Sequence, residues 1–228
     1  MKSIVLDAIT IYQFVWDVLD SNCYVIKEEN SSLIIDPIDL QEFYDFIKNT
    51  KDATIILTHA HYDHICGLNR VRELVPKTTV ICSKACSINI QSPQKNLSNI
   101  ANAVLAFHEH REQRDEVKPF VCAGADAIYK GSKKIQWKDH VIELSEYHGH
   151  SPDSQCIILD ETILFSGDTL LPIPTVTRLP GGSNKCFIEE DIPRLKTLQI
   201  EKVFPGHGEN GKLQEMILIN KDLFNRIK

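Results

Sequence analysis

The chain has 228 residues, of which 43% are hydrophobic and 25% are charged, as expected of a soluble globular protein large enough for one substantial core. Its formal net charge of −6 gives no overall positive field for collecting phosphate backbones, which disfavours nucleic acid as a partner. No stretch approaches the roughly 20 apolar residues that cross a bilayer, and Asp7 and Asp17 interrupt the N-terminus where a signal peptide would be apolar. We therefore expect a single cytoplasmic domain, 1–228, with no membrane partner.

The first half of the chain alternates predicted strands and helices. The strands are short apolar runs next to turn residues, and the helices have apolar side chains at helical spacing. In order, they are a β-hairpin of 22–26 and 31–36, a helix at 40–49, a strand at 53–58 and a helix at 67–75. The stretch THAHYDH, residues 58–64, follows the last of these strands and leads into the last helix.

The second half begins with a segment, 83–135, whose pattern is less regular and which we interpret as an insertion or lid. It either covers the substrate or contacts a second subunit in a homodimer. The elements predicted after it are a hairpin at 134–144 with its turn at Lys138 and Asp139, a hairpin at 155–168 with its turn at Asp160 and Glu161, a helix near 188–198, a strand at 202–208 and a helix at 212–227.

Histidine and aspartate gather at the ends of four predicted strands, where polar side chains can converge without breaking the core. Imidazole and carboxylate are suitable ligands for zinc, manganese or iron. Seven such groups are too many for one ion, but they suit two ions about 3.5–4 Å apart. The seven candidate ligands are His59, His61, Asp63, His64, His150, Asp168 and His207.

The spacing within THAHYDH supports a metal site. Alternate residues of an extended chain point the same way, so His59 and His61 can bind one ion while Tyr62 points elsewhere. Asp63 and His64, at the start of the next helix, can turn towards a second ion. Isolated histidines are instead expected to be surface or hydrogen-bonded residues; these are His108, His110 and His140.

Four motifs, THAHYDHICGL, HGHSPDS, LFSGDTL and FPGHG, resemble in the same order those of the metallo-β-lactamase-fold hydrolases. The resemblance covers nearly the whole chain. It implies an α/β fold, a four-layered αββα sandwich with a dinuclear site at one edge. By this resemblance, His59, His61 and His150 hold the first metal, Asp63, His64 and His207 hold the second, and Asp168 bridges them. Cys66, which replaces a glycine common at that family position, is expected to have a packing role.

The resemblance implies two divalent metal ions, zinc in the first place, with iron or manganese as alternatives. The implied reaction is hydrolysis by a metal-bridging hydroxide, with Asp63 orienting the hydroxide and receiving its proton. Asp168 stands where true β-lactamases of this fold lack a bridging aspartate, which argues against antibiotic hydrolysis. Residues 169–206 contain no tyrosine, unlike the homoserine-lactone hydrolases of the fold.

The motifs GDTLL and TRLPGGS resemble compact thioester hydrolases of the glyoxalase II type. Only 20 residues follow Gly208, which leaves no room for the helical domain that helps larger members bind glutathione. We therefore expect a small-molecule or carrier-bound acyl thioester as the substrate. Arg178 and Lys185 are candidates for binding a carboxylate or phosphate of that substrate. Three alternatives remain: an iron-dependent persulfide dioxygenase, a lactone or phosphodiester hydrolase, and a metal-bound accessory protein of a biosynthetic pathway.

Overall fold

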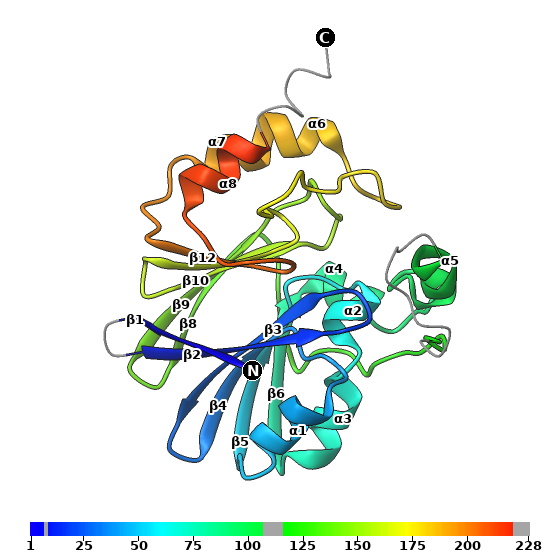
Figure 1. Ribbon diagram of the computed structural model, residues 1–228, viewed down its shortest axis with the longest axis vertical. Helices are drawn as coiled ribbons and strands as arrows, with labels where there is room; N and C mark the ends of the chain where they lie inside the picture. Colours follow the sequence, from blue (N-terminus) through cyan, green and yellow to red (C-terminus); the bar gives the residue numbers. More distant parts are fainter. Residues whose placement is uncertain (7–8, 107–115, 221–228) are drawn as a thin grey trace. The chain divides into compact units, whose positions relative to one another are not determined.

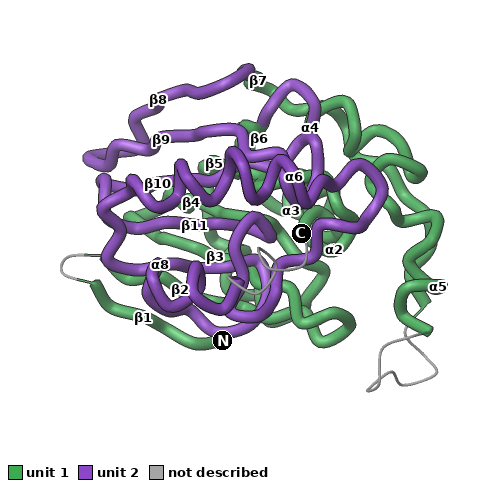
Figure 2. Tube along the Cα trace, turned by 90° about the horizontal axis from the view of Figure 1, so that it is seen from above, with its two compact units in different colours: residues 1–82, 86–128 green, residues 83–85, 129–228 purple. Residues whose placement is uncertain are grey.

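The structure, a computed structural model, describes residues 1–6, 9–106 and 116–220. The chain divides into two compact units, coloured separately in Figure 2. Unit 1 comprises residues 1–82 and 86–128, and unit 2 comprises residues 83–85 and 129–228. Each unit is built around one β-sheet.

The sheet of unit 1 has seven strands in the order in which they occur in the chain. They are β1 (Lys2–Leu6), β2 (Ile9–Trp16), β3 (Ser21–Glu28), β4 (Ser31–Ile35), β5 (Asp52–Ile56), β6 (Lys77–Ser83) and β7 (Ala127–Tyr129). The first four pair antiparallel, whereas β4, β5 and β6 pair parallel. The predicted hairpin and buried strand are confirmed as β3, β4 and β5. The strands β1 and β2 extend the sheet beyond the predicted elements.

Short helices accompany this sheet, and α1 and α3 lie along the same side of it (Figure 1). The helices of unit 1 are α1 (Gln41–Ile47), α2 (Tyr62–Ile65), α3 (Leu68–Leu74), α4 (Lys84–Asn89), the 3₁₀ turn η1 (Ser98–Ile100) and α5 (Ala101–Leu105), with the first residues of α4 belonging to unit 2. Both predicted helices are present. Phe43 of α1 is fully buried, with its ring centroid 5.6 Å from that of Phe14 in β2, so the apolar spacing of α1 indeed marks its buried side.

Unit 2 contains a five-stranded sheet in the order β12-β11-β10-β9-β8. The strands are β8 (Ser132–Trp137), β9 (His140–Glu146), β10 (Gln155–Leu159), β11 (Ile163–Gly167) and β12 (Lys202–Pro205). Both predicted hairpins are confirmed, and Lys138, Asp160 and Glu161 have φ values of 54°, 47° and 65° at their turns. Three residues, 160–162, separate β10 from β11, and the positive φ of Asp160 and Glu161 lets the chain reverse within this short loop.

Helices lie along one side of the unit 2 sheet (Figure 1). They are α6 (Asn184–Cys186), the π-helical η2 (Phe187–Asp191), α7 (Ile192–Leu195) and α8 (Leu213–Ile219). Their buried side chains form one apolar cluster with those of the sheet, in which Phe187, Leu195 and Met216 are at most 1% exposed. The helix predicted near 188–198 corresponds to α6, η2 and α7, which begin at Asn184 and end at Leu195. Residues 221–227 of the last predicted helix lie outside the described residues.

The middle segment, 83–135, contains more regular structure than its sequence pattern indicates. It includes the end of β6, then α4, η1, α5, β7 and the start of β8. Residues 107–115 lie outside the described part, and with them His108 and His110. The role of this segment as a lid stays a prediction. Within the described ranges, no helix is long and apolar enough to span a membrane.

Candidate metal centre

The first group of candidate ligands, which we call the first ligand cluster, consists of His59, His61, Asp63 and His64. These residues follow β5, where the chain leaves the sheet and enters α2. All four are buried, with side chains or whole residues no more than 8% exposed. The sequence places them there because a continuous apolar strand, ATIIL, anchors the backbone immediately before the histidines.

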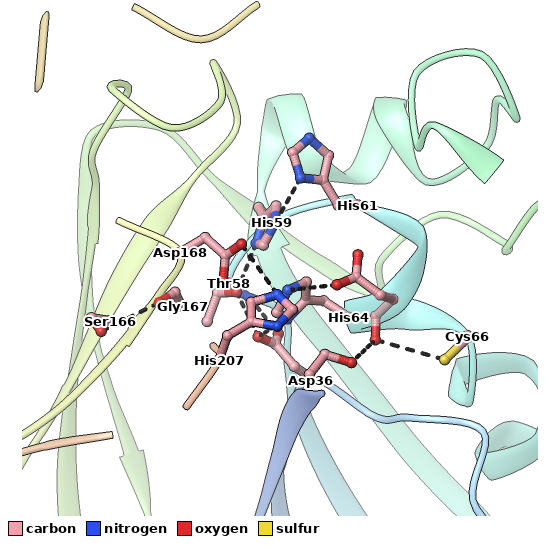
Figure 3. Close-up of polar contacts among 12 residues, drawn as sticks. Asp36, Thr58, His59, His61, His64, Cys66, Ser166, Gly167, Asp168 and His207 are labelled. Atoms are coloured by element: carbon pink, nitrogen blue, oxygen red, sulfur yellow. Dashed lines mark hydrogen bonds and ion pairs between the residues drawn. The ribbon is translucent and has the colours of Figure 1, made fainter. Parts of the chain in front are cut away.

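Nitrogen and oxygen atoms converge within the first ligand cluster. His59 Nε2 lies 3.0 Å from His61 Nδ1, and Figure 3 shows the two rings facing each other through these atoms. His64 Nε2 lies 3.3 Å from Asp63 Oδ2. The alternation predicted for His59 and His61 thus brings two imidazole nitrogens together, and the following turn brings an imidazole to a carboxylate.

Asp36, which follows β4, supports the first ligand cluster through contacts with Thr58 and His64. Its Oδ1 accepts a hydrogen bond from the Thr58 amide at 2.7 Å, and its Oδ2 accepts one from Thr58 Oγ1 at 2.6 Å. The same Oδ2 lies 3.2 Å from His64 Nδ1. Burial raises the pKa of Asp36, although its bonds with His64 and Thr58 oppose the rise.

These bonds determine which nitrogens of the histidines face the cluster. Because Thr58 Oγ1 donates its proton to Asp36, it can only accept at the 3.0 Å contact with His59 Nδ1. His59 and His64 therefore carry their protons on Nδ1 and present the lone pair of Nε2. The role of Asp36 is absent from the sequence prediction. The feature that could have identified Asp36 is its place at the end of β4, which pairs in parallel with the strand before the histidines.

Unit 2 carries the second ligand cluster, which consists of His150, Asp168 and His207. Asp168 Oδ2 lies 3.6 Å from His150 Nε2 and 3.4 Å from His207 Nε2. His150 Nδ1 donates to the Val176 carbonyl at 2.6 Å, so its Nε2 carries the lone pair that faces Asp168. One carboxylate oxygen thus lies near two imidazole nitrogens, and the bridging role of Asp168 stays a prediction.

The turns around Asp168 and His207 are joined by main-chain and side-chain bonds. Gly206 N donates to Gly167 O at 2.8 Å, which brings the residues that follow β11 and β12 together. Ser166 Oγ donates to Leu170 O at 2.7 Å and to Gly167 O at 3.3 Å, the latter drawn in Figure 3. These bonds keep Asp168 at the end of the sheet.

A buried carboxylate holds the loop before His150. Asp191 Oδ2 accepts from Gly149 N at 2.7 Å, and its Oδ1 accepts from His148 N at 3.3 Å. A Cβ at position 149 would lie 2.5 Å from Phe187 Cβ and 2.6 Å from Asp191 Oδ2, so only glycine fits there. Burial raises the pKa of Asp191, while the two backbone bonds oppose that rise.

Both clusters have the chemistry of a divalent-cation site. A lone pair of His64 faces a carboxylate oxygen, and in unit 2 two imidazole nitrogens face another, at distances longer than ordinary hydrogen bonds. Two acceptors face each other favourably only with a proton or a cation between them. Neutral imidazole nitrogens combined with carboxylates are typical ligands of zinc and iron. The residues therefore fit divalent cations.

The remaining residues singled out from the sequence have other surroundings. Arg178 is exposed, and exposed Lys185 lies 3.8 Å from the Glu189 carboxylate, so a role of either in substrate binding stays a prediction. His140 bonds Asp160 at 2.6 Å through Nδ1, which confirms it as a hydrogen-bonded residue. Cys66 Sγ accepts from Asp39 N at 3.2 Å, and burial raises the pKa of its thiol, consistent with packing.

Comparison with known proteins places this geometry in a family. The family model described as the metallo-beta-lactamase superfamily matches residues 16–207. A probable metallo-hydrolase of Streptococcus pyogenes serotype M6 is 26% identical over 87% of this chain and 83% of its own. A hydroxyacylglutathione hydrolase of Actinobacillus pleuropneumoniae serotype 5b is 23% identical over 87% of this chain and 72% of its own. The solved structure of the BLEG-1 B3 metallo-beta-lactamase has a TM-score of 0.72 at 23% identity, covering 93% of this chain and 99% of that one.

The chain belongs to the metallo-beta-lactamase superfamily. Its activity class is accordingly that of a metal-dependent hydrolase, whose fold binds divalent metals. The predicted α/β fold class is confirmed, because each unit contributes a mixed sheet with helices against it.

Proposed function

We propose that this protein hydrolyses acyl thioesters and that the two ligand clusters together hold two divalent cations. His59, His61 and His150 are assigned to one cation, Asp63, His64 and His207 to the other, and Asp168 to both. Support comes from the ligand atoms within each unit: His59, His64 and His150 each turn Nε2 towards a nitrogen or oxygen atom of another assigned ligand.

When bound, two such cations would lower the pKa of a bound water to about 7 and would act as a Lewis acid for the developing negative charge. The protein's own residues orient the histidine ligands and accept a proton. Asp63 directs one carboxylate oxygen at His64, and its second oxygen is assigned to accept the proton of the attacking water. Asp36 keeps His59 and His64 in the tautomer that leaves Nε2 open to a cation.

Zinc is the proposed native metal. The assigned ligands are five imidazoles and two carboxylates, with no thiolate among them. This set suits zinc and also fits iron or manganese, so elemental analysis of the purified protein decides between them.

The observation that carries the thioester assignment is the similarity to a hydroxyacylglutathione hydrolase along most of both chains. The motifs GDTLL and TRLPGGS support it from the sequence. A thioester also suits the site, because its carbonyl is readily attacked by activated water and its thiolate leaves without a proton donor. We propose a small-molecule or carrier-bound acyl thioester as the substrate.

The test is a substrate panel on zinc-loaded protein: an acylglutathione, an acyl-pantetheine thioester, a homoserine lactone, a cephalosporin and a phosphodiester. We expect thioester turnover to exceed that of the other classes. Asp63→Asn should lower kcat by about 100-fold or more, as loss of a general base does. His140→Ala, which removes a histidine outside both clusters, should leave turnover unchanged. Hydrolysis of a lactone or phosphodiester without any thioester would contradict the thioester assignment alone.

A further inference from the structure

Asn96, from a distant part of the sequence, contacts the turn that carries the first ligand cluster. Its carbonyl accepts a hydrogen bond from the amide of Tyr62 at 2.8 Å, and Tyr62 lies between His61 and Asp63. Asn96 itself is completely buried. Its carbonyl is therefore part of the support of a turn that carries four proposed ligands.

This contact satisfies the first amide of a short helix. The first amides of a helix have no partner inside the helix, and the side chain of the preceding residue commonly caps the second or third of them. In α2 that residue is His61, whose side chain makes no capping bond. The Tyr62 amide, the first of the helix, is satisfied by Asn96 instead. The position of α2 thus depends on where the Asn96 carbonyl lies.

The Asn96 side chain determines the direction of that carbonyl. Its Oδ1 accepts from Ser98 N at 2.9 Å, and its Nδ2 donates to Phe120 O at 2.9 Å. Leu97, enclosed between these bonds, has a φ of 64° although it is buried and not glycine. A left-handed conformation at such a residue is unfavourable and persists only where the surroundings enforce it. The two side-chain bonds of Asn96 provide that enforcement.

We propose that Asn96 is a positioning residue for the metal ligands of the first cluster. The inference rests on the proposed function, because it assumes that His61 and Asp63 bind cations. The side chain of Asn96 maintains the strained turn at Leu97, the turn directs the Asn96 carbonyl at Tyr62, and this bond sets the placement of His61 and Asp63 on either side.

The chain offers a matched control in Asn102. Its side chain also makes two bonds to the backbone of a later segment, donating to Val117 O at 3.0 Å and accepting from Val117 N at 3.0 Å. Both asparagines therefore bond the backbone of residues 117–120, and Asn96 in addition accepts from the Tyr62 amide in the ligand turn. A purely structural role predicts similar consequences for the two substitutions.

The experiment compares Asn96→Ala with Asn102→Ala. Zinc affinity is measured by competition with a chromophoric chelator, cobalt(II) coordination by the visible absorption spectrum, and stability by urea unfolding of metal-free protein. We expect Asn96→Ala to weaken zinc binding by about 10–100-fold, the range for residues that orient ligands, and to alter the cobalt spectrum. Asn102→Ala should lower stability similarly while leaving zinc affinity and the cobalt spectrum unchanged.

Asn96→Asp provides a second variant should the alanine variant not fold. It keeps the oxygen that accepts from Ser98 N and removes the donor to Phe120 O, so its zinc affinity should lie between those of wild type and Asn96→Ala, or below wild type if only it folds. Equal zinc affinity in the wild type and in the folded Asn96 variants would overturn this inference and leave the proposed function intact. A wild type that binds no zinc would overturn both.

Discussion

Asp36 orients three residues of the first ligand turn, namely Thr58, His59 and His64. It accepts two hydrogen bonds from Thr58, lies 3.2 Å from His64, and through Thr58 Oγ1 also determines the tautomer of His59. A carboxylate can do this because both of its oxygens accept. Burial makes the arrangement costly, as the raised pKa of Asp36 indicates, so its retention at this place fits a role in orienting ligands.

Replacing Asp36 with asparagine tests this role. In Asp36→Asn the amide oxygen can still accept from the Thr58 amide, but the NH₂ group then faces His64 Nδ1 and Thr58 Oγ1. His64 would have to accept at Nδ1 and carry its proton on Nε2, the nitrogen assigned to the metal. We expect zinc affinity to fall by about 10–100-fold, measured by chelator competition. An unchanged affinity would mean that His64 does not bind through Nε2.

At the scale of the elements, short helices and turns hold the ligands at the ends of the strands. α2 has only four residues and is followed at once by α3, so its placement depends on contacts with other segments. One of these is the approach of Gly67 to the loop after β4, where Gly67 N donates to Pro37 O at 2.9 Å. A Cβ on residue 67 would lie 2.2 Å from Ile38 O, which leaves no room for a side chain.

Gly67→Ala should therefore lower the free energy of unfolding by about 1–3 kcal/mol, the usual cost of overpacking, as measured by urea unfolding. Gly124→Ala is the matched control, because its new methyl group would meet the end of the flexible Gln91 side chain at 3.1 Å and Ser87 Oγ at 3.4 Å, and no backbone atom is among its nearest neighbours. We expect the control to change stability by less than about 0.5 kcal/mol. Equal losses in the two variants would show that the contact with Ile38 is not what excludes a side chain.

At the scale of the whole molecule, the proposed ligands are divided between the two compact units. The first cluster belongs to unit 1 and the second to unit 2. A cation that binds ligands from both units stabilises the folded form of both, because it binds the native state and has little affinity for unfolded chain. The division of the ligand set thus gives the proposed function a consequence that can be measured without a substrate.

Zinc should slow amide hydrogen exchange in both units at once. At a free zinc concentration 100 times the dissociation constant, the expected stabilisation is about 2.7 kcal/mol. Exchange measured by mass spectrometry with and without zinc should show protection at residues 57–66 in unit 1 and at 147–151 and 204–208 in unit 2. Protection confined to one unit would contradict a shared pair of cations.

Local patterns in the sequence were sufficient for much of the fold and for the choice of ligand candidates. The hairpin with its turn at Asp160 and Glu161 follows from turn residues between apolar runs, and the facing nitrogens of His59 and His61 follow from alternation along an extended chain. The family resemblance was confirmed by the match over residues 16–207. Each of these depends on neighbours within a few residues, which is the range over which periodicity carries information.

By itself, then, the sequence determined the strands and helices within 22–75 and most of those after 134, the family and the class of chemistry. Only the tertiary structure decided which residues orient the candidate ligands: Asp36, Asn96 and Asp191 act on histidines or ligand turns 28 to 42 positions away in the chain. No spacing rule links such pairs. Their hydrogen bonds exist because the folded chain buries polar groups together, and buried polar groups must find partners wherever the fold places them.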